Sequence, residues 1–260
     1  MRAFPKFSTT LALSVACAFG AALPGAAQER SFNFALGAGV SNEPAYPGAD
    51  SNRTRPDFAF TFGAVEWGPI EQGSRIGSIP SNGLALRGSF RIVGSRDSGD
   101  NSELAGLKDI DTAVELGLGA VYRGDNVRVF GGVRQGFGGH EGVTGTLGAD
   151  VIFRPGSKWT ISAGPRINFG NSEYASTYFG ISQEESAASQ FGAYEAEGGV
   201  LGAGFSVIAA YQLDQRWAVG GQIGYERLLN DAGNSPITQL GSNDQWTLRL
   251  GLSRSFDLQF

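Results

Sequence analysis

The sequence predicts an all-β fold, a closed antiparallel transmembrane β-barrel of about ten strands. Three observations lead to this prediction. The C-terminal segment 245–260 alternates apolar and polar side chains. Gly makes up 40 of the 260 residues, roughly twice its usual frequency, and these glycines are interspersed among segments that alternate in the same way. The N-terminal segment 1–27 has the pattern of a secretory signal peptide.

The C-terminal strand shows the clearest alternation. A period of two places its apolar row on one face and polar residues such as Thr247 on the other. An apolar outer face and a terminal Phe are typical of the closing strand of an outer-membrane barrel, with a soluble sandwich as the alternative. We assign the assembly signal to Gly251 with Phe256 or Phe260. Arg254 interrupts an apolar row that comprises Trp246, Leu248, Leu250, Leu252, Phe256, Leu258 and Phe260.

The segment 1–27 is predicted to be cleaved, which leaves 28–260 as a single barrel domain. Two basic residues precede a run of mostly small apolar residues, and small residues end the segment at Ala27. The only cysteine, Cys17, is removed with it, so no disulfide is expected. Without those two basic residues, the 20 Lys and Arg fall to 18 against 25 Asp and Glu. This acidic balance argues against nucleic acid as a partner.

Nine further segments alternate over about ten residues, the length that a tilted membrane strand needs. No apolar run after residue 27 is long enough for a transmembrane helix, and alternation keeps the mean hydropathy at −0.12. The connections 68–82 and 170–199 could each hide one more strand, so twelve strands is the alternative. In chain order, the outward rows span 32–40, 58–62, 84–92, 114–122, 127–133, 143–153, 159–169, 201–213 and 217–225.

The connections between these strands fall into two kinds. Tight turns contain Gly, Pro and Asp, whereas the long connections are polar. Bacterial barrels place short turns in the periplasm and long loops outside. We therefore expect both termini in the periplasm and the long connections outside. The tight turns are 123–126, 154–158 and 214–216, and the outer connections are 42–56, 94–110, 138–142, 170–199 and 229–244.

Aromatic residues at the strand ends agree with this orientation. Trp and Tyr prefer the level of the lipid headgroups. We therefore expect a membrane-interface belt at the periplasmic ends of the strands, with ordinary strand aromatics as the alternative. The belt would comprise Trp67, Tyr122, Trp159, Tyr211 and Trp217.

Charged side chains occupy the inward rows. Ten strands enclose a narrow interior, which nine charged side chains would largely fill. The favoured interpretation is a plug of ion pairs. A narrow pore that prefers anions is the alternative, because six residues are basic and three are acidic. These lumen charges are Arg87, Arg91, Glu115, Arg128, Arg134, Asp150, Arg166, Glu226 and Arg249.

Residues suited to catalysis or metal binding are few. His140 is the only histidine and lies in a Gly-rich connection, where a turn residue is the usual role. A hydrolase would need a nucleophile within hydrogen-bond reach of His140, and the sequence names none. One His and no mature Cys offer no zinc spacing, and the acidic residues of 94–110 do not match an EF-hand. We expect no catalytic residue, cofactor or metal.

Five motifs in the connections carry a further signal. They are Ala45–Asp50, Leu104–Asp111, Gly139–Gly142, Ser172–Ser182 and Tyr225–Ile237. Together they resemble the MltA-interacting protein / OmpV family of outer-membrane proteins, over essentially the whole mature chain. The Tyr-Phe-Gly block from Tyr178 and the Arg-Leu…Asp-Ala…Ser-Pro block from Arg227 are the specific ones. Arg254 and the extension 257–260 depart from the pattern of the family.

The resemblance implies a non-enzymatic protein in the outer membrane of a Gram-negative bacterium. One type of member is viewed as a scaffold that joins a lytic transglycosylase to a murein synthase, and others are linked to osmotic response or adhesion. The expected partners are outer-membrane lipid and lipopolysaccharide, the barrel assembly machinery and periplasmic murein enzymes. A small-solute channel and a hydrolase that uses His140 are the competing hypotheses.

Overall fold

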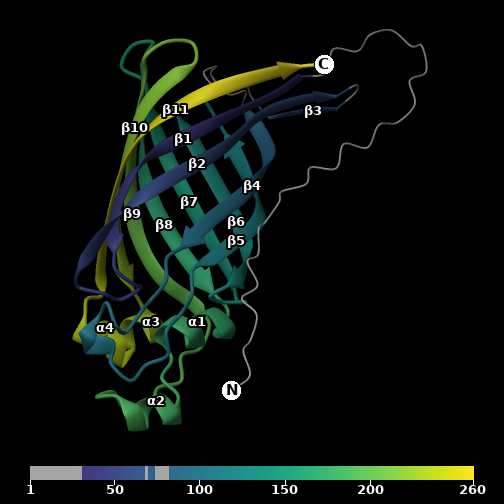
Figure 1. The fold of residues 1–260 in the computed structure, drawn as a ribbon. Coiled ribbons are helices and arrows are strands. Elements are labelled where there is room, and N and C mark those ends of the chain that lie inside the picture. Colours follow the sequence, from purple (N-terminus) through teal and green to yellow (C-terminus); the bar gives the residue numbers. More distant parts are fainter. Residues whose placement is uncertain (1–30, 68–69, 74–81) are drawn as a thin grey trace, which may run out of the picture.

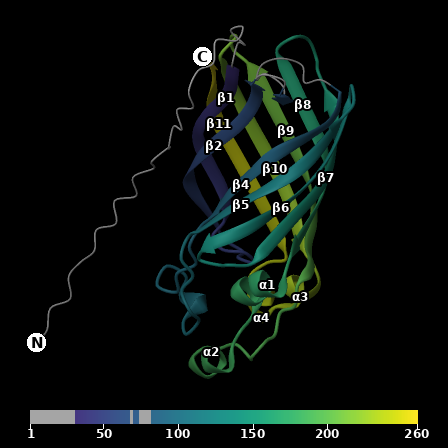
Figure 2. The same cartoon turned by 90° about the vertical axis from the view of Figure 1, so that its right-hand side faces the viewer.

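The computed structural model describes residues 31–67, 70–73 and 82–260, with side-chain burial described outside 62–81. These residues form one antiparallel sheet that curls into a barrel wall, with short helices gathered at one end (Figures 1 and 2). The predicted signal peptide 1–27 lies outside the described residues.

Eleven strands are present among the described residues. Ten of them are 11 to 16 residues long and correspond to the ten predicted strands, whereas the short β3 has four residues. The strands are β1 (Ser31–Pro44), β2 (Asn52–Trp67), β3 (Ile70–Gly73), β4 (Gly83–Val93), β5 (Ala113–Arg123), β6 (Val127–Gly138), β7 (Val143–Phe153), β8 (Trp159–Gly170), β9 (Gly199–Gln212), β10 (Trp217–Leu228) and β11 (Asp244–Gln259).

The order in the sheet is β3-β2-β1-β11-β10-β9-β8-β7-β6-β5-β4. All neighbours are antiparallel, and β1 pairs with β11 over twelve residues from Ser31↔Gln259 to Asn42↔Leu248. The two ends of the sheet approach each other where β3 lies beside β4. Within the described part of the chain, no hydrogen-bonded ladder joins β2 to β4.

The twelve-strand alternative is wrong for the connection 170–199, which contains helices rather than a hidden strand. α1 (Ser172–Phe179) and α2 (Gln183–Ala188) each begin after a capping residue. The Asn171 side chain accepts a hydrogen bond from the Tyr174 N–H, and Ser182 forms a capping box with Glu185. Such caps satisfy backbone donors that a helix start leaves unpaired, so the local sequence favours helix here.

The outer face of the sheet is apolar. Leu84, Leu86 and Leu118 are 70 to 75% exposed, and each of the other long strands carries large apolar side chains that are at least 37% exposed. Soluble monomers rarely expose one continuous apolar surface of this extent. The sheet therefore has an apolar outer face, opposite the face that carries the charged side chains. No helix among the described residues is long and apolar enough to cross a membrane.

The two kinds of connection lie at opposite ends of the wall. The tight turns share one end with the C-terminus, and the long connections carry the helices at the other end (Figure 1). β1 and β2 extend into the predicted connection 42–56 and leave only 45–51 between them. Besides α1 and α2, this end contains η1 (Ser102–Leu104), α3 (Asn230–Asn234) and α4 (Pro236–Leu240). We call these five helices and their connections the loop cap.

The loop cap has a folded core of its own, although its sequence reads as polar connections. Tyr178 and Phe179 of α1 pack with Ala232 of α3 in one buried cluster. Leu104 and Ile237 lie in a second cluster, which also contains Tyr46 and Phe191. The loop cap is therefore a packed layer over one end of the barrel wall.

We predict that Leu250→Arg impairs assembly far more than Thr247→Arg. Leu250 is 56% exposed on the outer face, whereas Thr247 lines the interior. An Arg that faces lipid near the middle of a strand costs about 2–4 kcal/mol, and an Arg in a polar interior avoids that cost. The amount of folded protein in isolated membranes measures the difference. Equal yields of the two variants would contradict this assignment of faces.

Candidate functional site

The interior below the loop cap is organised around one carboxylate. Glu115 of β5 is fully buried and lies beside Arg91 in the β4–β5 register. Arg91 Nη2 lies 2.6 Å from Glu115 Oε1, and Arg134 Nε lies 2.8 Å from Oε2. The Thr144 hydroxyl donates to the same Oε2 over 3.0 Å. Three neighbouring strands thus place donors around one anion, and each bond to the charge is stronger than a neutral one.

His140 joins Glu115 to the loop cap. Its Nε2 lies 3.2 Å from Glu115 Oε1, and its side chain is fully buried. The ring makes edge contacts with Tyr174 and Tyr178 of α1, with centroids 5.0 and 5.6 Å apart. A Cβ on Gly136 would overlap the imidazole, so the lack of a side chain there makes room for it.

The protonation state of His140 follows from this environment. Burial lowers its pKa below the ordinary value, although the Glu115 carboxylate acts in the opposite direction. We infer a neutral ring at pH 7. Within the described residues neither ring nitrogen makes a well-aligned hydrogen bond, so His140 serves this site through packing and its contact with Glu115.

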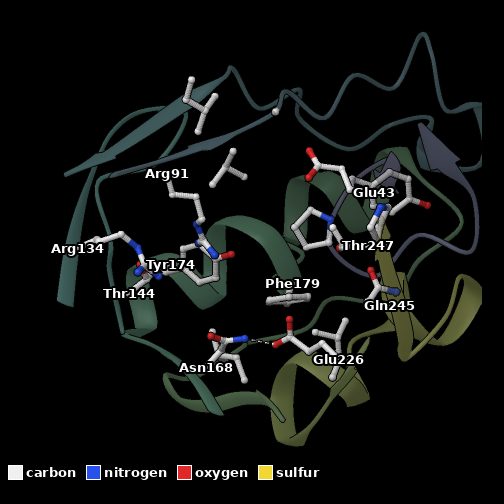
Figure 3. A pocket seen from close by; sticks show the side chains of 18 of the residues that line it. Glu43, Arg91, Arg134, Thr144, Asn168, Tyr174, Phe179, Glu226, Gln245 and Thr247 are labelled. Carbon is white, nitrogen blue, oxygen red and sulfur yellow. Dashed lines mark hydrogen bonds between the residues drawn. The ribbon is translucent and has the colours of Figure 1, made fainter. Parts of the chain in front are cut away.

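A chain of polar contacts continues from Glu115 around the wall. Arg134 Nη2 donates to Thr146 Oγ1 over 3.1 Å, and that hydroxyl donates to Asn168 Oδ1 over 2.9 Å. Asn168 Nδ2 then donates to Glu226 Oε1 over 2.9 Å, the bond drawn in Figure 3. We call this set the polar network; it comprises Arg91, Glu115, Arg134, His140, Thr144, Thr146, Asn168 and Glu226.

A cavity of about 220 Å³ lies between the polar network and the loop cap. Figure 3 shows Arg91 and Tyr174 on one side of it, with Glu43, Gln245 and Thr247 on the other. The space is large enough for roughly seven water molecules at about 30 Å³ each. The interior here is filled mainly by protein side chains.

A second cluster fills the interior nearer the tight turns. Arg128 pairs with Asp150 in the β6–β7 register, and Arg166 Nη2 lies 2.7 Å from Asp150 Oδ1. The guanidinium groups of Arg87, Arg128 and Arg166 lie 5.8, 5.5 and 4.8 Å from the centroid of the Phe130 ring. Cations favour such positions over an aromatic face. We call Arg87, Arg128, Phe130, Asp150 and Arg166 the turn-end cluster.

The nine predicted lumen charges thus fall into three groups. Four lie in the polar network and four in the turn-end cluster. The ninth, Arg249, lies 3.3 Å from Glu43 on the other side of the barrel. Sequence reasoning missed Glu43, Phe130 and the two tyrosines of α1. Phe130 lies on the same face of its strand as Arg128 and Arg134, so the alternation of the sequence could have identified it as an interior residue. Tyr174 and Tyr178 reach the site only because 170–199 folds into helices.

The predicted interface aromatics lie at the turn end of the strands. Trp159 and Tyr211 face each other in the β8–β9 register with centroids 4.9 Å apart. Tyr122 is 55% exposed at the end of β5, and Trp217 begins β10. Trp67 ends β2, and its side chain lies outside the described ones. Their role at a membrane interface stays a prediction.

The predicted assembly residues lie along β11. Gly251 faces Gly39 across the β1–β11 pair, and the Phe256 ring stacks on Phe34 with centroids 5.2 Å apart. Phe260 is exposed beyond the end of the strand. Arg254, which interrupts the apolar row, places its guanidinium 5.4 Å from the Trp217 ring centroid and 5.1 Å from that of Phe256.

This geometry suits a structural interior better than a reaction centre. The His140 side chain is enclosed by Glu115 and two tyrosine rings. The described residues contain no group of three or more His, Cys, Asp or Glu that could hold a metal ion. Most charges are paired across neighbouring strands, which joins the strands to one another and to the loop cap.

Comparison with known proteins identifies a family by sequence. The model of the family described as MltA-interacting protein MipA matches residues 36–256. No curated protein sequence matches the chain.

Solved structures that resemble the fold are bacterial outer-membrane proteins of low sequence identity. An outer membrane channel from Pseudomonas putida has 12% identity and a TM-score of 0.45, with 90% of this chain and 97% of that chain covered. Outer membrane protein OprG from Pseudomonas aeruginosa has 12% identity and a TM-score of 0.29, covering 87% and 97%. Neisserial surface protein A has 10% identity and a TM-score of 0.29, covering 86% and 97%.

We predict that Glu115→Gln strongly destabilises the protein. The change removes the charge that faces Arg91 and Arg134, and breaking a buried ion pair on one side costs about 3–5 kcal/mol. We expect the lower end of that range, since the Arg91 side chain is 36% exposed. Urea unfolding in detergent micelles measures the free energy. Glu184→Gln on the exposed face of α2 is the matched control, and an equal effect of both changes would refute the central role of Glu115.

Proposed function

Since the chain belongs to the family of MltA-interacting protein MipA, we propose that it is a non-conducting outer-membrane barrel that acts as an interaction protein of the cell envelope. A periplasmic murein enzyme of the kind for which the family is named is the proposed partner. The proposed role is non-enzymatic.

The observation that carries this proposal is the filled interior. The polar network and the turn-end cluster occupy it at two levels. The loop cap covers one end with two buried apolar clusters, in which Tyr178 and Ile237 are fully buried. A path for solutes would require these paired charges and packed helices to separate. The surface, rather than the lumen, is therefore the proposed working part.

The apolar outer face supports placement in a membrane, with outer-membrane lipid and lipopolysaccharide around it. We propose that the loop cap faces outward and the tight turns face the periplasm, as is usual for bacterial barrels. The barrel assembly machinery would then recognise the C-terminal strand through Gly251, Phe256 and Phe260. A murein enzyme would meet the turn end, where the connections 124–126, 154–158 and 213–216 are short and where β3 pairs with β2.

A narrow channel that prefers anions is the second candidate. The turn-end cluster favours it, because it contains three arginines, Arg87, Arg128 and Arg166, and a single carboxylate, Asp150, which pairs with two of them. An excess of fixed positive charge raises the local concentration of anions.

Two measurements on the same purified protein test the proposed function. Reconstituted into planar bilayers, the protein should give no steady conductance steps, and it should bind a purified lytic transglycosylase of the MltA type in detergent. Stable anion-selective steps would favour the channel instead. A lack of binding to the murein enzyme would refute the interaction role with this class of partner.

We predict that Ala187→Cys is labelled from outside intact cells and that Ser157→Cys is not. Ala187 is exposed on α2 in the loop cap, and Ser157 is exposed in the tight turn between β7 and β8. The single native cysteine, Cys17, lies in the predicted signal peptide, so the mature protein gives no background. Reaction with an impermeant maleimide, before and after the outer membrane is opened, measures the orientation. The reverse pattern would place the loop cap in the periplasm.

A further inference from the structure

The barrel wall has a seam between β2 and β4. At the turn end, the short β3 pairs with β2 and lies beside β4. At the loop end, the described residues of β2 and β4 share no ladder, and a cavity of about 510 Å³ separates them. This cavity is lined both by side chains of the outer face and by side chains of the interior.

The seam has apolar side chains on the outer face of the wall and charged side chains on the inner face. On the outer face, Phe58 of β2 is 69% exposed, while Phe90 and Ile92 of β4 are 52% and 50% exposed. On the inner side, four guanidinium groups line the cavity, and the carboxylates that line it are Glu43 and Asp57. The four guanidinium groups belong to Arg53, Arg55, Arg91 and Arg249.

Two of these arginines share one carboxylate. Arg55 Nη1 lies 4.0 Å from Glu43 Oε1, and Arg249 Nη2 lies 3.3 Å from Glu43 Oε2. Arg53 and Arg91 have separate partners, Asp100 at 3.3 Å and Glu115 at 2.6 Å. Arg55 and Arg249 therefore share Glu43 as their ion-pair partner, and Asp57 is the other carboxylate that lines the cavity.

Arg55 crosses the seam. A Cβ on Gly94, which follows β4, would overlap the Arg55 guanidinium, so this group lies directly against the Gly94 backbone. Its Nη2 also donates to the Ala45 carbonyl over 3.3 Å. The guanidinium is thus held between β2 and the end of β4, and it lines the same cavity as Phe58, Phe90 and Ile92.

We propose that the seam binds a phosphate-bearing lipid of the surrounding bilayer. Its phosphate would contact Arg55 and Arg249, and an acyl chain would lie over Phe58, Phe90 and Ile92. The proposal rests on the membrane placement given above and not on the identity of the protein partner. Arginine pairs well with phosphate because its planar donors can bind two oxygens at once.

The occupant is a lipid rather than a free anion because the arginines open onto an apolar surface. A dissolved phosphate has no apolar part, so contact with Phe58 and Phe90 does not stabilise it. An acyl chain can pack on these side chains without the desolvation of any polar group. The charge and the apolar face together fit an amphiphile.

Native mass spectrometry of the full protein in detergent tests the site. Phosphatidylglycerol should be retained about tenfold more strongly than phosphatidylcholine of the same chain length, since the second carries no net negative charge. Equal retention of the two lipids would overturn the proposal. Displacement by inorganic phosphate at the same concentration as the lipid would show a small-anion site instead, which also overturns it.

Two pairs of variants locate the site. Arg55→Gln with Arg249→Gln should remove the preference, and Arg154→Gln with Arg216→Gln, which remove the same charge at the turn end, should keep it. Gly94→Ala should weaken retention because it displaces the Arg55 guanidinium. Gly88→Ala, on β4 with open space around it, should not. The assignment would be refuted if the Arg154→Gln/Arg216→Gln protein lost the preference for phosphatidylglycerol. It would also be refuted if the Arg55→Gln/Arg249→Gln protein and the Gly94→Ala protein both kept it. Unchanged circular dichroism shows that each variant is folded.

Discussion

The buried Glu115 carboxylate is the contact on which the rest of the interior depends. Taking an anion out of water is costly, and the cost is offset only when several donors surround the charge. Arg91, Arg134 and Thr144 supply those donors from β4, β6 and β7. His140 brings the same carboxylate into contact with α1. One charge thus fixes the relative positions of four strands and the loop cap.

Ion pairs and apolar packing stabilise different regions of the molecule. Ion pairs hold the inside of the wall, where neighbouring strands place opposite charges in register. Apolar contacts hold the loop cap, in which Tyr178, Phe179 and Ile237 are buried. The outer face is left with large apolar side chains and few charges. This division leaves most of the interior charges in ion pairs.

The strands and the faces of the predicted charges could be inferred from sequence, because a period of two is a local property. Pairing between strands was only partly accessible. The tight turn 124–126 fixes the β5–β6 register and so places Glu115 opposite Gly136. The long connection between β4 and β5 does not fix the register of these two strands, so the Arg91–Glu115 pair could not be derived from the sequence. The helices of 170–199 left a capping signal at Ser182 and Glu185, but their packing depends on distant residues such as Ser235.

The pairing of β1 with β11 has a consequence for how the protein folds. Asn33 donates to the Phe256 carbonyl across 223 residues of chain, whereas most other strands pair with a neighbour in sequence. Contacts between distant residues form late, because the entropy of closing so large a loop is lost before the contact stabilises anything. The hairpins from β4 to β10 can form while β1 still has an open edge. Until β11 pairs with β1, the backbone donors and acceptors on that edge of β1 are unpaired and can bind a strand of another chain. The edge of β1 therefore has to be shielded from other chains until the β1–β11 pair forms.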